Sequence, residues 1–124
     1  MSLLAADEPA AFSVVRPSGR SRFVLTCDHA SRRIPRSLGT LGLSEEELGT
    51  HVAWDIGAAG VADRLSALLD ASLLLQGYSR LVIDCNRPFD SPGSIPLISE
   101  ATEIPGNGGL TREQVAERQR AVFL

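Results

Sequence analysis

The chain has 124 residues, of which 44% are hydrophobic and 22% are charged, and its formal net charge is −3. These values fit one soluble globular domain and exclude the clustered basic face of a nucleic-acid-binding protein. No apolar run reaches the roughly 18–20 residues of a membrane span, and the N-terminus lacks the pattern of a signal peptide. The two cysteines, Cys27 and Cys85, form no disulfide framework, so we expect reduced thiols and a cytoplasmic location.

Short apolar runs bounded by turn residues predict four strands. They lie at residues 12–15, 23–27, 72–76 and 81–85. The near-continuous apolar character of the run at 23–27 suits a strand covered on both faces of a sheet. Residues 1–11 carry no such pattern, and we expect a loose leader there.

Three stretches carry helix signals. Ser44 with Glu47 fits a capping box, which predicts a short helix after Ser44. Thr111 with Gln114 forms a second capping box and predicts a helix near the end of the chain. Between them, an apolar stripe at helical spacing predicts a longer helix over about 55–70. Its members are Trp54, Ala58, Val61, Leu65, Leu68 and Leu69.

The order strand, helix, strand, strand predicts an α/β fold with a mixed, largely parallel sheet in a single domain over 1–124. The segment at 86–109 is rich in proline and glycine and is interpreted as a long loop, which in a compact domain is usually functional or disordered. No stop signal follows the last helix before Leu124, which predicts an incomplete domain. An incomplete domain exposes apolar faces, so we expect self-association into a homo-oligomer.

Polar clusters follow two of the predicted strands. Residues 27–29 (Cys-Asp-His) end the strand at 23–27, and residues 84–87 (Asp-Cys-Asn-Arg) end the strand at 81–85. If the two strands are parallel in one sheet, both clusters lie at the same edge. Ligands of open α/β sheets bind outside the carboxyl ends of the strands, so this edge is the predicted site.

Each residue of interest has a functional and a structural interpretation. His29 could act as a metal ligand or a general base, or could simply be hydrogen-bonded at a strand end. His51 and Asp55 are spaced i,i+4 and would share one face of a helix, where they could hold an ion; Asp55 could equally be a helix N-cap. Cys27 could be a nucleophile with His29, although a cysteine there more often packs as a small apolar residue.

Arg87, directly after Asn86, suits the binding of a carboxylate ligand. The guanidinium offers a bidentate fork and the amide adds a donor. The structural alternative is a surface arginine that pairs with Asp84 or Asp90. The glycine-rich run at 106–109 lacks a following lysine and therefore favours a flexible turn over a phosphate cradle.

Four blocks of the chain together resemble the N-formylglutamate amidohydrolase family, and they run in the family's order over roughly residues 22–124. The blocks are Cys27-Asp28-His29-Ala30 with Ile34-Pro35, His51-Val52-Ala53-Trp54-Asp55-Ile56-Gly57-Ala58, Tyr78-Ser79-Arg80-Leu81-Val82-Ile83-Asp84-Cys85-Asn86-Arg87-Pro88, and Ile104-Pro105-Gly106-Asn107. The family is similar to zinc-dependent carboxypeptidases and aspartoacylases. The resemblance therefore implies a three-layer α/β/α fold with a mixed sheet.

The resemblance also implies roles for individual residues. It places His29 at a zinc-ligand position, and it places Asn86 with Arg87 at the clamp for a substrate carboxylate, to which we add Arg80. The residue three positions after His29 is Arg32, where the carboxypeptidase pattern has a glutamate ligand. A carboxylate ligand must therefore come from elsewhere in the chain.

We take His51 and Asp55 as the further metal ligands. Asp28 and Asp55 are the candidate catalytic carboxylates, with Asp28 as an outer-shell partner of His29. The predicted function is zinc-dependent hydrolysis of the amide bond of an N-acyl amino acid, with N-formyl-L-glutamate as the named substrate. Two alternatives stay open: a truncated or degenerate family member that only binds an acid, and a thiol hydrolase that uses Cys27 with His29.

Overall fold

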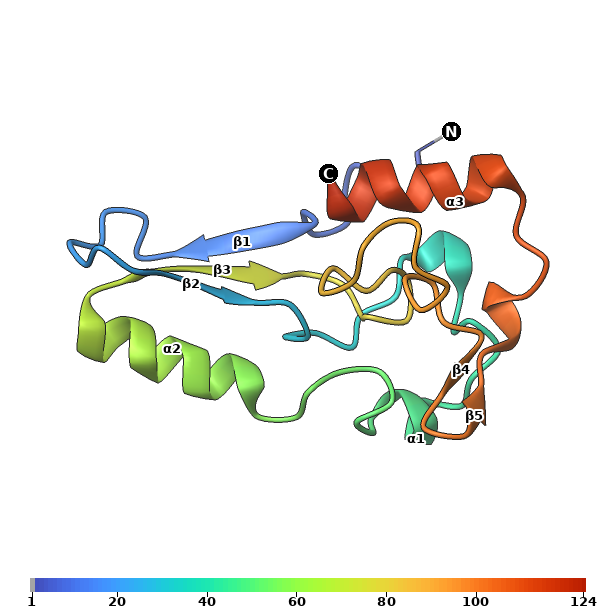
Figure 1. The fold of residues 1–124 in the computed structure, drawn as a ribbon, viewed down its shortest axis with the longest axis horizontal. Coiled ribbons are helices and arrows are strands. Elements are labelled where there is room, and N and C mark those ends of the chain that lie inside the picture. The colour runs from blue at the N-terminus through green and yellow to red at the C-terminus, as the bar shows by residue number, and fades with distance from the viewer. Residues whose placement is uncertain (1) are drawn as a thin grey trace.

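The computed structural model describes residues 2–124, and its centre is a mixed three-stranded sheet. Strand β1 spans Phe12–Val15, β2 spans Val24–Cys27 and β3 spans Ser72–Gln76. The order is β1-β3-β2, with β1 antiparallel and β2 parallel to β3 (Figure 1). Three of the four predicted strands and the predicted α/β class with a mixed sheet are thereby confirmed.

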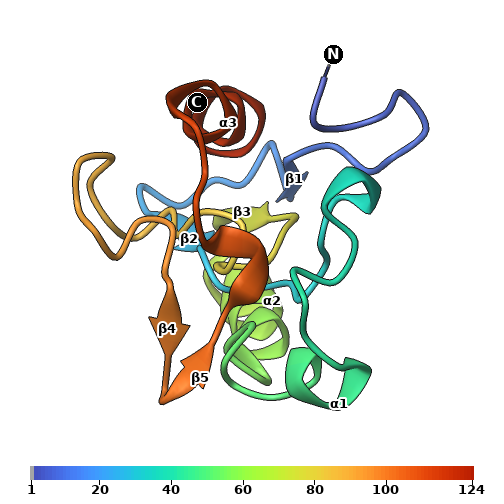
Figure 2. The same ribbon diagram turned by 90° about the vertical axis from the view of Figure 1, so that its right-hand side faces the viewer.

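Helix α2, Ala58–Leu69, runs along one face of the sheet, as Figures 1 and 2 show. It begins later than predicted because Gly57, with φ at +85°, breaks the backbone before it. The helix packs on β2 and β3 through the side that carries the half-buried Ala59 and Ala62 and the buried Ser66. Small side chains there allow the helix to approach the sheet closely.

The apolar stripe of α2 points away from the sheet and is not the face through which the helix packs. Leu68 is 82% exposed, and Val61, Leu65 and Leu69 are also exposed. The periodicity identified the helix correctly, but it could not show which of the helix's two low-polarity faces meets the sheet.

The predicted strand at 81–85 is also wrong. Residues 79–84 form turns and irregular backbone instead, starting with the bond from Ser79 N–H to the Arg33 carbonyl (2.7 Å) and the turn from Val82 N–H to the Ser79 carbonyl (3.0 Å). The side chains of Leu81, Val82 and Ile83 are all buried. A short apolar run buried on every side looks like a central strand, because periodicity alone does not separate the two.

The main hydrophobic core lies among loops and short helices beyond the ends of the strands. We call this cluster the loop core; it comprises Leu3, Leu41, Leu43, Leu48, Val52, Ala53, Tyr78, Leu81, Val82, Ile83, Ile104 and Val122. The N-terminal residues are held to it rather than being loose. Leu3 is buried in the cluster, and the Tyr78 hydroxyl donates to the Pro9 carbonyl (2.7 Å).

Two capped helices border the loop core. Helix α1, Glu45–Leu48, begins at the capping box of Ser44, and helix α3, Arg112–Arg118, begins at the capping box of Thr111. Both predicted capping boxes are confirmed. After Arg118 the helix continues as a π-type turn over Gln119–Phe123. Helix α3 lies on the side of the sheet opposite α2 and is displaced toward the loop core (Figure 1).

The long segment at 86–109 contains short regular elements. Strands β4, Ile98–Ser99, and β5, Thr102–Glu103, form an antiparallel hairpin, and a 3-10 turn follows at Pro105–Asn107 (Figure 2). Another 3-10 turn lies at Arg36–Leu38. Across the part of the chain that the structure describes, we find no helix with the length and apolar character needed to span a membrane.

Candidate active site

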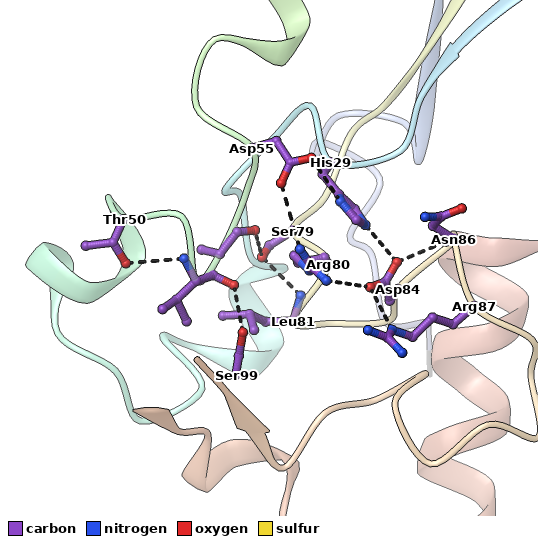
Figure 3. Close-up of polar contacts among 12 residues, drawn as sticks. His29, Thr50, Asp55, Ser79, Arg80, Leu81, Asp84, Asn86, Arg87 and Ser99 are labelled. Atoms are coloured by element: carbon purple, nitrogen blue, oxygen red, sulfur yellow. Dashed lines mark hydrogen bonds and ion pairs between the residues drawn. The ribbon is translucent and has the colours of Figure 1, made fainter. Parts of the chain in front are cut away.

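His29 stands just beyond the end of β2, with an acidic side chain at each ring nitrogen. Its Nε2 lies 2.8 Å from Asp84 Oδ1, and its Nδ1 lies 3.3 Å from Asp55 Oδ2 (Figure 3). The His29 side chain is only 11% exposed. A carboxylate can only accept a hydrogen bond, so two carboxylates fix the plane and the orientation of the imidazole ring.

Asp84 is the centre of the cluster. Asp84 is only 2% exposed. Its carboxylate oxygens accept hydrogen bonds from His29, from Arg80 Nη2 (3.1 Å) and from the Asn86 backbone N–H (2.9 Å). Arg87 Nε lies 3.4 Å from the same carboxylate (Figure 3). Burial opposes ionisation of Asp84, but the hydrogen bonds from His29 and Asn86 and the charges of His29 and Arg80 outweigh it, so the pKa of Asp84 is lowered.

Asp55 forms the open side of the cluster. Its side chain is 54% exposed and lies 3.8 Å from Arg80 Nη1, while its backbone N–H donates to the His29 carbonyl (3.0 Å). This backbone bond fixes the segment before α2 to the end of β2. Asp55 is therefore the carboxylate that a molecule from solvent reaches first, whereas Asp84 is enclosed.

Asn86 and Arg87 lie exposed beside Asp84. Arg87 folds over Gly93, where an added Cβ would lie 3.0–3.3 Å from the guanidinium and Cδ atoms. Arg87 Nε lies 3.4 Å from Asp84 Oδ2, so the structural alternative, a surface arginine that pairs with Asp84, is found, while binding of a carboxylate ligand stays a prediction. Arg80, which contacts Asp55 and Asp84, is the inner of the two arginines.

The structure does not bring every candidate residue into this cluster. His51 is exposed in a turn that precedes α2, so the expected helical i,i+4 pair of His51 and Asp55 is wrong, and the N-cap of α2 is Gly57 rather than Asp55. Asp28 lines a different cavity, together with Cys85 and residues of β3 and the C-terminal turn.

Neither cysteine has the environment of a nucleophile. Cys27 is buried in the sheet, and burial together with the charges of Asp28 and Asp55 raises the pKa of its thiol. Burial, with the charges of Asp28 and Asp84, raises the pKa of Cys85 to about 11. Because the thiolate is the nucleophile, these pKa values argue against the thiol-hydrolase alternative.

The cluster supplies fewer ligands than a catalytic zinc ion requires. Catalytic zinc sites use three protein ligands and hold the other nitrogen of a ligating histidine with a carboxylate. Here Asp84, which makes the shorter contact with His29, is suited to orient the imidazole ring. The two potential zinc ligands are then His29 Nδ1 and the Asp55 carboxylate. Within residues 2–124, no group of three or more His, Cys, Asp or Glu side chains is placed to hold a metal. The residues present thus do not complete a catalytic zinc site.

Asp84 is the residue of the cluster to which the sequence assigned no chemical role of its own. It was expected in the polar cluster at 84–87 and as a possible partner of Arg87, at the end of a strand that the structure does not contain. The predicted meeting of residues 84–87 with His29 is nevertheless confirmed. It arises because the turn after β3 returns to the end of β2, and not because two parallel strands end together. A carboxylate directly after three apolar residues was the available signal.

Comparison with known proteins identifies the family. The family model of N-formylglutamate amidohydrolase matches residues 21–124. The chain belongs to this family. The fold is similar to the crystal structure of gene product Atu2144 from Agrobacterium tumefaciens, with a TM-score of 0.95 and 42% sequence identity. That match covers 98% of this chain and 48% of the other, so this chain spans about half the length of the similar protein. No curated protein matches it.

In this member of the N-formylglutamate amidohydrolase family, the cluster combines three chemical capacities. His29 offers a proton-transfer group between two fixed carboxylates. Asp55 offers an exposed carboxylate, which can accept a proton. The half-exposed Arg87 and the exposed amide of Asn86 offer donors to an anion. Proton transfer beside anion binding is the combination that hydrolysis of an acidic amide requires.

Proposed function

We propose that the cluster around Asp84 serves the hydrolysis of the amide bond of an N-acyl amino acid, with N-formyl-L-glutamate as substrate. The observation that carries the proposal is the position of the His29 imidazole between Asp84 and Asp55. Arg80 and Arg87 both contact the Asp84 carboxylate. Membership of the family supports the reaction class. We propose on the same ground that N-formyl-L-glutamate is the substrate, that zinc is the metal, and that the whole family protein has a three-layer α/β/α fold.

Substrate binding is assigned to Asn86, Arg87 and Arg80. Arg87 is 50% exposed, and its Nε lies 3.4 Å from Asp84. We assign the terminal nitrogens of this exposed guanidinium to a carboxylate of the substrate, which they would bind as a fork. Asn86 adds an amide donor beside it. Arg80 lies deeper, between Asp55 and Asp84, where its charge stabilises an oxygen that becomes negative during the reaction.

Proton transfer is assigned to Asp55 and His29. In the reaction, water adds to the formyl carbon, the C–N bond breaks, and formate and glutamate leave. The proton lost by the water ends on the departing nitrogen. Asp55 is exposed at the mouth of the cluster and accepts the proton from water. His29, which is oriented by Asp84, is the group that passes a proton to the nitrogen. Asp28 lies outside the cluster and receives no role.

The activity test measures formate and glutamate released from N-formyl-L-glutamate by the purified chain. Asp84→Asn should lower kcat/KM by about 100-fold or more, because the carboxylate no longer orients His29. Arg87→Met should act mainly on KM, since it removes binding to the substrate carboxylate. Arg22→Met, at an exposed arginine away from the cluster, is the matched control and should change neither constant. Release of formate that persists undiminished in Asp84→Asn would overturn the assignment.

Zinc is tested separately. His29 and Asp55 would supply two ligands, and the predicted third, His51, is exposed in a turn that precedes α2. Because two ligands do not complete a catalytic zinc site, calorimetry should give only weak zinc binding, and His29→Ala should abolish it. Retention of the same affinity in His29→Ala would remove His29 from the ligand set, and a large loss in His51→Ala would restore His51 to it.

The second candidate function is acid binding without turnover. It is favoured by the ligand set, which is one short of a catalytic zinc site among residues 2–124. It predicts that N-formyl-L-glutamate binds in calorimetry, that Arg87→Met weakens this binding, and that no formate appears with or without zinc. Formate release by the wild-type chain would exclude this reading.

A further inference from the structure

The buried segment Leu81–Ile83 is held by side chains and not by a neighbouring strand. Asn107 Nδ2 donates to the Leu81 carbonyl (2.8 Å), and Arg118 Nη1 donates to the Val82 carbonyl (3.0 Å). Buried carbonyl groups that lack a partner are costly, so these two donors replace the bonds that a strand would have supplied. The next residue along the chain is Asp84, the centre of the candidate site.

The two donors are joined to one another. Arg118 Nη1 also donates to Asn107 Oδ1 at 2.7 Å, and Asn107 Nδ2 also donates to the Pro96 carbonyl at 2.8 Å. Both side chains are buried, Arg118 to 2% exposure. Together with residues 81 and 82 they form one hydrogen-bonded unit between α3, the turn at Pro105–Asn107 and the segment that carries Asp84.

Arg118 is an unusual component of a core. Among residues 2–124 it makes no ion pair with a carboxylate: its donors meet only uncharged oxygens, including a long contact to the Gly106 carbonyl (3.5 Å). Burial lowers the pKa of this guanidinium. An apolar side chain of the same size would avoid the cost of desolvating a charge. The cost is accounted for if the planar, forked donor geometry is what the position requires.

We propose that Arg118 and Asn107 are positioning residues of the candidate active site. They hold the segment Leu81–Ile83 by its carbonyl groups and thereby set the place of the Asp84 carboxylate against His29. Neither residue touches the cluster itself, and both act through the backbone that leads into Asp84. The functional part of this inference rests on the proposed function, while the geometric part concerns only the orientation of His29.

The test uses the ¹⁵N chemical shifts of the histidine ring nitrogens at one fixed pH. The chain has only two histidines, and the exposed His51 serves as an internal reference. Arg118→Lys keeps the charge but lacks the fork; Asn107→Asp keeps the oxygen that faces Arg118 but loses both amide donors. Arg120→Lys, at an exposed arginine of the same C-terminal helical segment, is the matched control.

We expect both test variants to stay folded, to shift the Nε2 resonance of His29 and to leave that of His51 in place, with Arg120→Lys unchanged. If the wild-type chain hydrolyses N-formyl-L-glutamate, kcat/KM should fall about 10- to 100-fold in Arg118→Lys. Folded variants with wild-type His29 signals overturn the proposal. Unfolding of both variants also overturns it, because the pair would then support the whole fold. The histidine spectra can be recorded whether or not the chain hydrolyses a substrate. An inactive wild-type chain would therefore overturn the proposed function but would not affect this test of the positioning role.

Discussion

The sheet and the loop core are built in opposite ways. The sheet, with β1, β2, β3 and α2, has the regular hydrogen bonding, yet most of its apolar side chains are exposed, among them Phe12, Val24 and Leu68. The loop core has little regular structure, yet its side chains are almost completely buried. In this molecule, backbone regularity and burial of apolar surface are thus found in different places.

The difference shows what each region needs from its side chains. Strands satisfy their backbone groups by pairing, so their side chains are free to be exposed. The loop core has no such ladder, and buried polar groups such as Asn107 and Arg118 must supply the missing bonds. The candidate active site stands where the two regions meet, with His29 from the end of β2 and Asp84 from the loop core.

The largest expected effect contrasts two leucines. Leu81→Ala, in the loop core, should lower the free energy of unfolding by about 2–5 kcal/mol, because it leaves a cavity among fully buried side chains. Leu68→Ala, on the exposed side of α2, should change it by less than about 0.5 kcal/mol. Urea denaturation measures both. Equal losses would contradict the division of the molecule into a buried and an exposed apolar region.

The next effect concerns the thiol of Cys85. Its pKa of about 11, against an ordinary 9.0, means that the unfolded chain loses this proton first as the pH rises. Stability should therefore fall between pH 9 and 11, and at pH 8 iodoacetamide should react with Cys85 about 100-fold more slowly in the folded protein than in urea. Mass spectrometry of a Cys27→Ala variant isolates this thiol. Rapid labelling of the folded protein would show that the region around Cys85 opens easily.

A smaller effect concerns the cap of α1. Ser44→Ala removes the side-chain acceptor for the Glu47 N–H (3.1 Å) and should cost about 1 kcal/mol. Thr111→Ala removes the equivalent bond to Gln114 (3.1 Å) at α3. If the loop core unfolds as one unit, both losses should appear in the same thermal transition. Two separate transitions would show that the helices border the core without sharing its stability.

The smallest effect on stability should come from Val61→Lys on α2. The side chain is 61% exposed, so the free energy of unfolding should change by less than about 0.5 kcal/mol. The expected change is in association: a charge in the exposed apolar stripe should lower the self-association that such surfaces favour. Sedimentation velocity compares the degree of self-association of the wild type with that of the variant. A wild type that is monomeric at high concentration would contradict the expected homo-oligomer.

Local signals in the sequence predicted local structure well. Both capping boxes, three strands and the existence of α2 follow from patterns that span only a few residues. The orientation of α2 did not follow, because Ala59, Ala62 and Ser66 form a face that is small rather than strongly apolar. A pattern ranks faces by hydrophobicity, whereas close packing on a sheet also selects for size.

The candidate site was predicted in part. The meeting of His29 with Asp55 and with residues 84–87 is found, whereas His51 and Asp28 lie elsewhere. The role proposed for Asp84 was not assigned from the sequence, because it depends on a turn whose sequence resembles that of a strand. The buried position of Arg118 was even harder to predict from the sequence, because an arginine on an amphipathic helix is normally solvated.

The place of the loop core has a consequence for how the chain folds. Its members run from Leu3 to Val122, so the contacts that bury them close very long loops. Such contacts form late, because the entropy of closing the loops is lost before the contacts compensate for it. The helix α2 and its neighbouring strand β3 are adjacent in sequence and can form first. During synthesis, we therefore expect the carbonyl groups of Leu81 and Val82 to stay hydrated until Asn107 and Arg118 are available to bind them, and Asp84 to take its place beside His29 only afterwards.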